Sequence, residues 1–288
     1  MHHTTKVKQY YEQNTRRFLF FKRDSTKSIH QPLWKEPTFT KEEAYAYANQ
    51  LILEAIQQST ARTPLTIIDL GCGVGSSIFY LQKQVPTATY YGITISEAQI
   101  AIAQKQAKQL LLQDTVQFLT ADFTNLPTEI PPINIAFSIE AFAHAADAEK
   151  YIEQISQKLK KGGKLILIDD FLNDTINLKQ LDEKAKKALQ DFQYGWLVNS
   201  LKTKKELTAM ATKYGLRLIH ETDLTPYMRN GTLKHKWIRF LVATFRWVYH
   251  LSPWQSYYFR SWIGGQAKQY CLKNQLIRYK KMVFEKVR

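Results

Sequence analysis

Short apolar runs alternate with amphipathic segments through the middle of the chain. The apolar runs have the length of strands, and the segments between them have the periodicity and the caps of helices. The predicted strands are Thr66–Asp69, Thr89–Thr94, Val116–Thr120, Ile133–Ser138 and Lys164–Asp169, and the predicted helices are Ser76–Gln84, Ser96–Leu112 and Glu149–Leu159. Alternation of this kind predicts an α/β fold whose mostly parallel sheet has helices on both faces.

Two helices are predicted before this core. Lys6–Phe21 has aromatic residues at helical spacing, and Thr40 with Glu43 three positions later is the capping box of a second helix. Between them, Ile29–Trp34 contains a proline, which disfavours helix in the residue before it. We expect residues 1–63 to form an N-terminal helical cap segment.

The pattern changes after Asp170. The predicted helices there are Leu178–Trp196, Thr203–Tyr214, Leu233–Leu251 and Ser256–Leu276, and the predicted strands are Leu216–Thr222 and Tyr279–Lys286. The last of these helices is expected to be interrupted at Gly264-Gly265, because glycine is a poor helix former. We expect residues 171–288 to supply helical lid insertions together with the last two strands of the sheet.

A glycine-rich loop follows the first predicted strand of the core. The segment reads Asp69-Leu70-Gly71-Cys72-Gly73-Val74-Gly75, and a predicted helix begins directly after it. Glycines in a strand–turn–helix context let the backbone approach a ligand closely. The loop lacks the Gly-Lys-Ser/Thr of an ATPase, and its third glycine comes too early for an NAD fingerprint.

This loop resembles the first motif of class I S-adenosylmethionine-dependent methyltransferases. The resemblance continues at the ends of the next four strands, in Tyr91–Ser96, Thr120–Phe123, Ile135–Phe142 and Leu159–Asp169. It implies a Rossmann-like, doubly wound, seven-stranded sheet with an antiparallel last strand. It also implies that residues 64–170 form the S-adenosylmethionine-binding core.

The resemblance assigns donor-binding roles to named residues. It places Gly71 and Gly73 at the methionine end of the cofactor, with Asp69 supporting the loop or the amino group, and it places Asp122 and Phe123 at the adenine. The second strand ends without the acid that many of these enzymes use to bind the ribose. In the lipid and natural-product methyltransferases that share Gly-Ile-Thr-Ile-Ser, Thr94 and Gln99 take over that role. Cys72, Ser96 and Ile139 complete the expected donor site.

Two of these assigned residues have an alternative interpretation that stays open. Phe123 could be an ordinary core residue, and Gln99 a solvated helix residue.

The segment Ser138–His144 occupies the place where substrate meets the methyl donor. Glu140 and His144 are four residues apart, so both can face one side of a helical turn and either is a candidate general base. The alternative is that Glu140 only orders a loop and that His144 is a satisfied polar core residue. Tyr11 is a weaker catalytic candidate, together with Tyr10 and His30. No metal is expected.

The resemblance and the charge together indicate the acceptor. The carboxyl-terminal pattern Trp262–Ala267 with Leu276–Lys280 resembles the end of terpenoid, sterol and tocopherol methyltransferases, and cyclopropane fatty-acid synthases share the strand-two pattern. We therefore expect a small lipophilic acceptor, isoprenoid-like, with methylation of carbon slightly favoured. O- or N-methylation of an aromatic or alkaloid natural product is the alternative.

The net charge of +15 is concentrated near the carboxyl terminus, where Glu285 is the only acid after Tyr227. An anionic partner would explain it: a diphosphate on the substrate, a membrane surface or nucleic acid. Nucleic acid is not expected, because no RNA-binding module is recognisable. The alternative functions from other classes are an RNA-directed methyltransferase and a protein that binds a membrane surface. The apolar stripe and basic flanks of Leu233–Leu251 predict a lid helix or a helix in a membrane interface.

The cellular setting is predicted from small signals. Cys72 and Cys271 are the only cysteines, and no signal peptide is visible. We expect a cytoplasmic enzyme of natural-product biosynthesis, with peripheral membrane contact as a further option. The sequence leaves the oligomeric state open.

Overall fold

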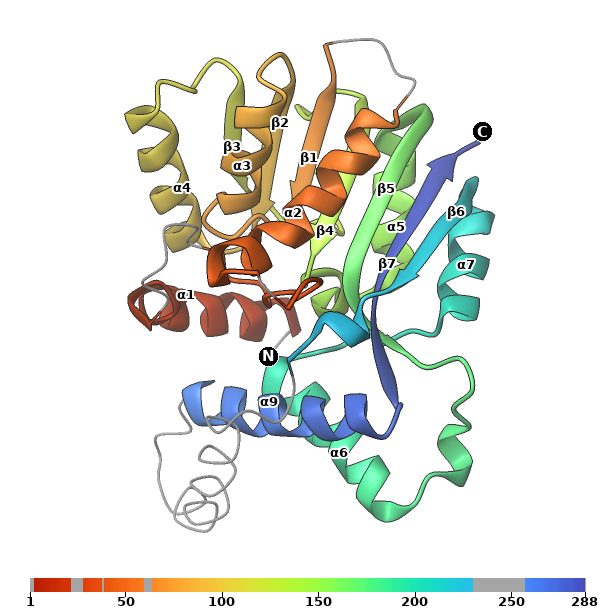
Figure 1. The fold of residues 1–288 in the computed structure, drawn as a ribbon. Helices are drawn as coiled ribbons and strands as arrows, with labels where there is room; N and C mark the ends of the chain where they lie inside the picture. The colour runs from red at the N-terminus through yellow and green to blue at the C-terminus, as the bar shows by residue number, and fades with distance from the viewer. Residues whose placement is uncertain (1–2, 22–27, 38, 60–63, 230–256, 288) are drawn as a thin grey trace.

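The described strands form one seven-stranded sheet in a computed structural model (Figure 1). The model describes residues 3–21, 28–37, 39–59, 64–229 and 257–287, so the predicted helix Leu233–Leu251 lies outside the described residues. The strand order is β3-β2-β1-β4-β5-β7-β6. The bounds are β1 Thr66–Leu70, β2 Thr89–Thr94, β3 Val116–Thr120, β4 Ile133–Ile139, β5 Leu159–Leu172, β6 Leu216–Asp223 and β7 Ile277–Lys286.

The first five strands are parallel, and β7 runs antiparallel to both β5 and β6. The predicted Rossmann-like sheet with an antiparallel last strand is therefore confirmed. The helices are α1 His3–Phe21, α2 Lys41–Gln57, α3 Ser76–Gln84, α4 Glu97–Gln109, α5 Ala148–Lys158, α6 Glu183–Trp196, α7 Lys204–Lys213 and α9 Tyr257–Lys273.

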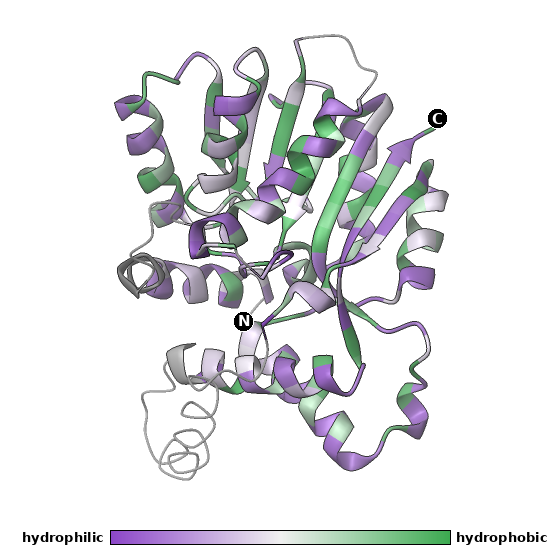
Figure 2. Cartoon of the chain, in the orientation of Figure 1, coloured by the Kyte–Doolittle hydropathy of each residue, from purple (hydrophilic) through white to green (hydrophobic). Residues whose placement is uncertain are grey.

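Alternate residues of the strands build two cores, one on each face of the sheet. Ile67 and Ile135 belong to the core that α2, α3 and α4 cover, whereas Ile68 and Ala136 belong to the core that α5 and α7 cover. Successive side chains of a strand point to opposite faces, so an apolar run buried on both sides follows from helices on both faces. In Figure 2 the central strands are largely hydrophobic, whereas the helices that cover them alternate between hydrophobic and hydrophilic residues.

The single helix predicted over Leu178–Trp196 is wrong. The segment forms a short 3-10 turn, Leu178–Gln180, and then α6. Asp182 separates them: its backbone is extended, and its carboxylate accepts the Ala185 N–H at 2.7 Å. Asp182 is therefore the N-cap of a new helix.

The interruption predicted at Gly264-Gly265 is also wrong, because α9 continues through both glycines. α6 and α9 lie against each other below the sheet (Figure 1). A Cβ at Gly264 would stand 2.4 Å from Trp196 Cδ1, and one at Gly195 would stand 2.3 Å from the Gly264 nitrogen. Gly195 and Gly264 thus permit the close approach of α6 and α9, and Gly264 does not end α9.

β5 begins earlier than Lys164, at Leu159. Gly162 and Gly163 lie in an irregularity inside the strand, where the register to β4 shifts between Ile133 and Ile135 and Gly162 has a φ of 76°.

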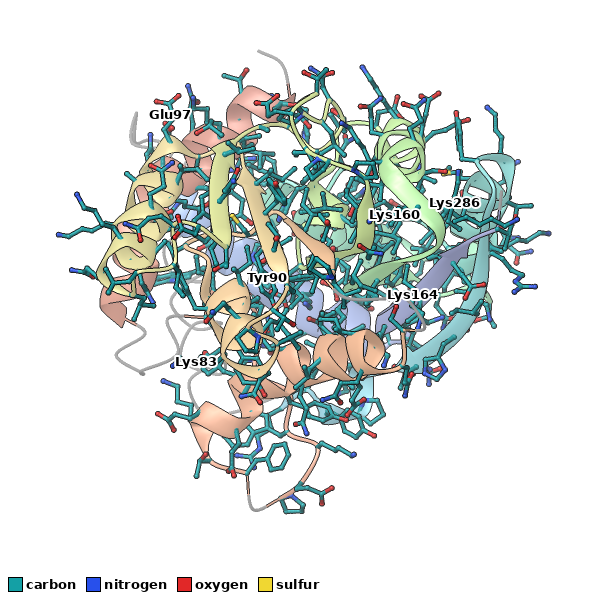
Figure 3. All side chains as sticks on the ribbon, turned by 90° about the horizontal axis from the view of Figure 1, so that it is seen from above. Lys83, Tyr90, Glu97, Lys160, Lys164 and Lys286 are labelled. Atoms are coloured by element: carbon teal, nitrogen blue, oxygen red, sulfur yellow. The ribbon has the colours of Figure 1, made fainter. Side chains whose placement is uncertain are left out.

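The amino ends of the strands form the edge opposite the glycine loop, seen from above in Figure 3, where Lys160, Lys164 and Lys286 are labelled. Lys164 Nζ donates to the carbonyls of Ala55 and Gln58 at 3.4 and 3.3 Å, which places a cation at the end of α2. Among the described residues, no helix is long and apolar enough to cross a bilayer.

Candidate functional site

Two adjoining hollows lie where the parallel strands end. The glycine-loop pocket is bounded by the loop after β1 and is lined by every residue that the sequence assigned to the cofactor except Ser96. The aromatic cavity, of about 340 Å³, has the rings of Tyr10, Tyr11, Tyr45 and Trp196 in its wall. Tyr11, Glu140 and His144 line both hollows. Ligands of open α/β sheets bind at this edge.

The glycine loop has a backbone that only glycine adopts without strain. Gly71, Gly73 and Gly75 have φ values of 96°, 56° and 83°. A Cβ at Gly71 would stand 2.4 Å from the Cβ of Ala141, so the site has no room for a side chain. The loop thus packs directly against the start of the segment after β4, and a cradle without side chains is left beside the pocket that Gly71 and Gly73 line.

Asp69 lies at the floor of this cradle. Its carboxyl group is almost fully buried, and burial raises its pKa to about 8. Within the described part of the chain it forms no ion pair. A buried carboxyl group without a cation beside a glycine cradle fits the amino group of S-adenosylmethionine.

Thr94 and Gln99 form a buried polar chain that reaches helix α1. The Thr94 hydroxyl donates to Gln99 Oε1 at 2.9 Å, and Gln99 Nε2 donates to the Thr15 hydroxyl at 3.1 Å. Gln99 is 2% exposed, so its interpretation as a solvated helix residue is wrong. Ser96 does not line the pocket; its Oγ caps α4 by accepting the Gln99 N–H at 3.4 Å.

Asp122 and Phe123 lie across the pocket from the glycine loop residues. Asp122 Oδ1 accepts the Thr124 N–H and hydroxyl, both at 2.8 Å, which fixes the carboxylate and leaves Oδ2 with the Thr4 hydroxyl at 3.4 Å. Phe123 is half-buried: its ring lines the pocket and also packs edge-to-face on Tyr151 at 5.1 Å. Asp122 presents a carboxylate that can accept a hydrogen bond from an adenine, and Phe123 presents a ring on which the adenine can pack.

Tyr11 and His144 form a hydrogen-bonded pair at the junction of the two hollows. His144 Nδ1 lies 3.2 Å from the Leu197 carbonyl, and the Tyr11 hydroxyl lies 2.9 Å from Nε2. A carbonyl can only accept, so Nδ1 carries the proton of the neutral ring and Nε2 accepts the Tyr11 hydroxyl proton. Burial lowers the pKa of His144, and burial raises the pKa of Tyr11 well above its usual range. The pair is therefore neutral near pH 7.

Glu140 stands in a left-handed backbone conformation, with a φ of 53°. Its own N–H donates to the Ile168 carbonyl at 2.9 Å, and its Oε1 accepts the Gln31 N–H at 3.1 Å. The helical turn that would align it with His144 is a 3-10 turn that covers only Phe142–His144. A non-glycine residue at such a φ is uncommon and clusters at functional sites.

Three buried charged residues beside the aromatic cavity had no role in the sequence-based prediction. Asp169 and Asp170 lie near the carboxyl end of β5, and Lys268 Nζ on α9 forms an ion pair with Asp170 Oδ2 at 2.7 Å. Asp169 accepts the N–H groups of Ala143 and Asp170 at 3.0 and 2.8 Å. Two consecutive acids after an apolar strand are a signal that could have marked this place, but their partner on a distant helix could not be identified from the sequence.

Comparisons with known proteins agree with this geometry. A family model described as a methyltransferase domain matches residues 62–215. Methyltransferase GfsG of Streptomyces halstedii is 26% identical over 206 residues, 71% of this chain and 71% of that protein.

Two solved structures share the fold. Cyclopropane synthase MmaA2 from Mycobacterium tuberculosis has a TM-score of 0.74 at 18% identity, with 98% of each chain covered. Geranyl diphosphate C-methyltransferase from Streptomyces coelicolor A3(2), solved with Mg²⁺, geranyl-S-thiolodiphosphate and S-adenosyl-L-homocysteine, has a TM-score of 0.71 at 14% identity, with 100% of this chain and 99% of that chain covered. At these identities, each likeness shows the fold alone.

The family model covers residues 62–215 of 288, which is more than half of the chain and includes the glycine loop and the strand ends around the pocket. The resemblance read from the five motifs is thus confirmed. The chain belongs to the methyltransferase domain family and is a small-molecule methyltransferase with S-adenosylmethionine as its cofactor.

Proposed function

We propose that this methyltransferase acts on a small lipophilic acceptor in the aromatic cavity while the methyl donor occupies the glycine-loop pocket. The observation that supports this arrangement is that Tyr11, Glu140 and His144 line both hollows. Methyl transfer depends on bringing donor and acceptor together in line, which adjoining pockets achieve by proximity and orientation. When bound, S-adenosylmethionine supplies a methyl group that its sulfonium charge already activates.

We assign donor binding to the residues that line the glycine-loop pocket: Asp69, Gly71, Cys72, Gly73, Thr94, Gln99, Asp122, Phe123 and Ile139. Asp69 offers a carboxyl group to the amino group, and Asp122 Oδ2 is available to the exocyclic amine of the adenine. Thr94 and Gln99 already bond each other, so the ribose would be held by their remaining donor and acceptor positions. A hydroxyl and an amide have that capacity.

Tyr11 and His144 can remove a proton from the acceptor. The Tyr11 oxygen would take the acceptor's proton as its own proton passes to His144 Nε2, 2.9 Å away. The Leu197 carbonyl at Nδ1 would hold the ring in place and stabilise the imidazolium that forms. A positioned base of this kind contributes about 10²–10⁴-fold to the rate.

Glu140 is suited to an electrostatic role beside this pair. The Gln31 N–H holds Oε1, and the left-handed backbone keeps the side chain at the junction of the hollows. A carboxylate there favours positive charge on the acceptor as the methyl group arrives.

The nature of the acceptor is supported by the lining of the aromatic cavity. Four aromatic rings and the aliphatic side chains of Ile29 and Val198 form part of it, as expected for a lipophilic ligand. An isoprenoid-like acceptor methylated on carbon is the finer form of the proposal, and the fold shared with a geranyl diphosphate C-methyltransferase is consistent with it. Methylation of oxygen or nitrogen in an aromatic or alkaloid compound is the alternative.

Calorimetry with S-adenosylmethionine and S-adenosylhomocysteine tests the donor half. Gly71→Arg should abolish binding of both, because a Cβ already has no room there. Gly162→Arg is the matched control, since that glycine also has a positive φ but nothing within 4 Å of its Cβ position. Unaltered binding in Gly71→Arg would reject the donor site.

An acceptor screen with labelled donor tests the other half. Isoprenoids, quinones and aromatic natural products are compared with RNA, and methyl transfer to RNA alone would reject a small acceptor.

The peripheral membrane contact predicted for Leu233–Leu251 has its own measurement. Sedimentation with anionic and neutral liposomes should show binding that fades with salt, and equal, negligible binding to both would reject it.

A further inference from the structure

The aromatic cavity is acidic. Three carboxyl groups line it, those of Glu140, Asp169 and Asp170, and among the described lining residues there is no lysine or arginine. This contrasts with the strongly basic composition of the whole chain. A cavity selects ligands by the charges in its own wall, because charges in water farther than about 10 Å away are largely screened.

The carboxyl group of Asp170 is incompletely satisfied. Lys268 Nζ pairs with its Oδ2 at 2.7 Å, but Oδ1 is buried and has no hydrogen-bond partner among the described residues. Asp170 is 3% exposed and lines the cavity. A buried carboxylate oxygen without a donor costs free energy, which a ligand that supplies a donor would recover.

Asp169 adds a second carboxyl group that the protein pairs with no cation among the described residues. Both of its oxygens accept backbone N–H groups, which favours the ionised form. Burial nevertheless raises its pKa to about 8, with the neighbouring Asp170 as the next cause. Lys268 is the one cation paired with this group of carboxylates among the described residues, so the wall stays short of positive charge.

Aromatic rings complete the same wall. Tyr10, Tyr11 and Tyr45 line the cavity together with the carboxyl groups. The faces of such rings attract an organic ammonium ion while packing against its hydrocarbon part. Carboxylates and ring faces in one hollow therefore favour a ligand that is both lipophilic and positively charged.

We propose that the aromatic cavity is a site for a lipophilic ammonium ion, and that the acceptor is an amine rather than a diphosphate. The inference rests on the proposed function, whose acceptor site this cavity is. It replaces the diphosphate that the basic composition suggested, and it moves a nitrogen of the acceptor ahead of the carbon as the methylated atom. The bound ammonium group would first lose one proton to the Tyr11 oxygen, as the Tyr11 proton passes to His144 Nε2. The freed nitrogen lone pair would then form the bond to the methyl carbon as the bond from that carbon to the sulfonium sulfur breaks and a neutral thioether leaves. The Asp170 Oδ1 oxygen accepts a hydrogen bond from the ammonium group, and Asp169 stands beside it.

Three probes with one hydrocarbon tail test the proposal: geranylamine, geraniol and geranyl diphosphate, the last with and without Mg²⁺. Their affinities are measured by calorimetry on the full chain at pH 7 with S-adenosylhomocysteine present. Geranylamine should bind about tenfold more tightly than geraniol, the size of a desolvated cation–π contact with an added charge-assisted hydrogen bond. Geranyl diphosphate should bind more weakly than geraniol.

Variants assign the effect to the cavity wall. Asp170→Asn should remove the preference for geranylamine over geraniol and leave the affinity for S-adenosylhomocysteine unchanged. Asp174→Asn is the control, because Asp174 is exposed and outside the cavity but removes the same charge. If Asp170→Asn does not fold, the double variant Asp170→Asn with Lys268→Met removes both members of the buried pair and serves in its place.

Three results would overturn the proposal: geranyl diphosphate binding more tightly than geranylamine with or without Mg²⁺, equal binding of geranylamine and geraniol, or no binding of any probe. Failure of the proposed function looks different. In that case S-adenosylhomocysteine itself does not bind, whatever the probes do.

Discussion

The Tyr11–His144 hydrogen bond joins a helix at the start of the chain to the segment after β4. Tyr11→Phe removes the hydroxyl that bonds His144 Nε2 and leaves the ring in place. We expect kcat to fall about 10²-fold with unchanged affinity for S-adenosylhomocysteine, as for loss of a positioned proton acceptor. Single-turnover and binding measurements check it. Tyr194→Phe, at a largely exposed tyrosine on α6, is the control, and a wild-type kcat in Tyr11→Phe would leave proximity as the mechanism.

Asp69 should lose a proton when S-adenosylhomocysteine binds, and this proton release can be measured. Burial raises its pKa to about 8, so much of it is protonated at pH 7 in the ligand-free protein. An ammonium group beside it favours the carboxylate and lowers that pKa. Binding of S-adenosylhomocysteine at pH 7 should therefore release a proton, measured by calorimetry in buffers of different ionisation enthalpy. Proton release that is unchanged in Asp69→Asn would contradict this assignment.

The pocket position of the proposed donor residues was predictable from the sequence because each stands at or just after the end of a strand. Gly71 and Asp122 follow β1 and β3, Thr94 ends β2, and parallel strands bring their ends to one edge. The acidic wall of the aromatic cavity was not predictable in the same way. Asp170 meets Lys268 only through the packing of α9 against the end of β5, and no local pattern encodes that contact.

At the scale of elements, the apolar runs and the helix caps in the sequence predicted most helix and strand bounds to within a few residues. The capping boxes at Thr40 and Thr203 begin α2 and α7, and the bounds of β2, β3 and α3 match those expected. The failures came from tertiary contacts or an overlooked cap. Gly264 reads as a helix breaker in isolation, and only the neighbouring helix shows why it is tolerated. Asp182 is a cap that the sequence does contain.

The α6–α9 contact gives a matched pair of substitutions. Gly264→Ala should destabilise the protein by about 1–3 kcal/mol, because its Cβ would overlap Trp196. Gly265→Ala should be neutral or stabilising by up to about 1 kcal/mol, because its Cβ meets ring atoms only at 3.7 Å and alanine is the better helix former. Urea denaturation of both variants checks the difference. Equal stability of the two would show that α6 and α9 are not tightly packed.

For the whole molecule, buried carboxyl groups predict the pH dependence of stability. The pKa values of Asp69 and Asp169 are raised to about 8, chiefly by burial, from about 3.9 in an unfolded chain. The folded state therefore holds protons that the unfolded state has lost, and the free energy of unfolding falls as the pH rises toward 8. The lowered pKa values of His3 and His144 act in the opposite sense, but below about pH 6.5.

The window from pH 6.5 to 8 thus isolates the carboxyl groups. Denaturation of the ligand-free protein should show falling stability across it, by up to about 1.4 kcal/mol per pH unit for each group. Asp69→Asn should reduce the slope. Constant or rising stability across this window would show that these groups are ionised in the folded protein.

The positions along the chain of the residues that line the two hollows affect how acceptor specificity can change in evolution. The donor residues lie between Asp69 and Ile139, whereas residues found only in the aromatic cavity come from both flanks, such as Tyr10 and Tyr45 before the core and Asp170 and Trp196 after it. A single genetic crossover within the core would join half of one cavity to half of another. Two crossovers, one on each side of β1–β4, would exchange both flanks of the aromatic cavity and keep the residues between Asp69 and Ile139, although they would also replace Thr4 and Thr15, which contact Asp122 and Gln99.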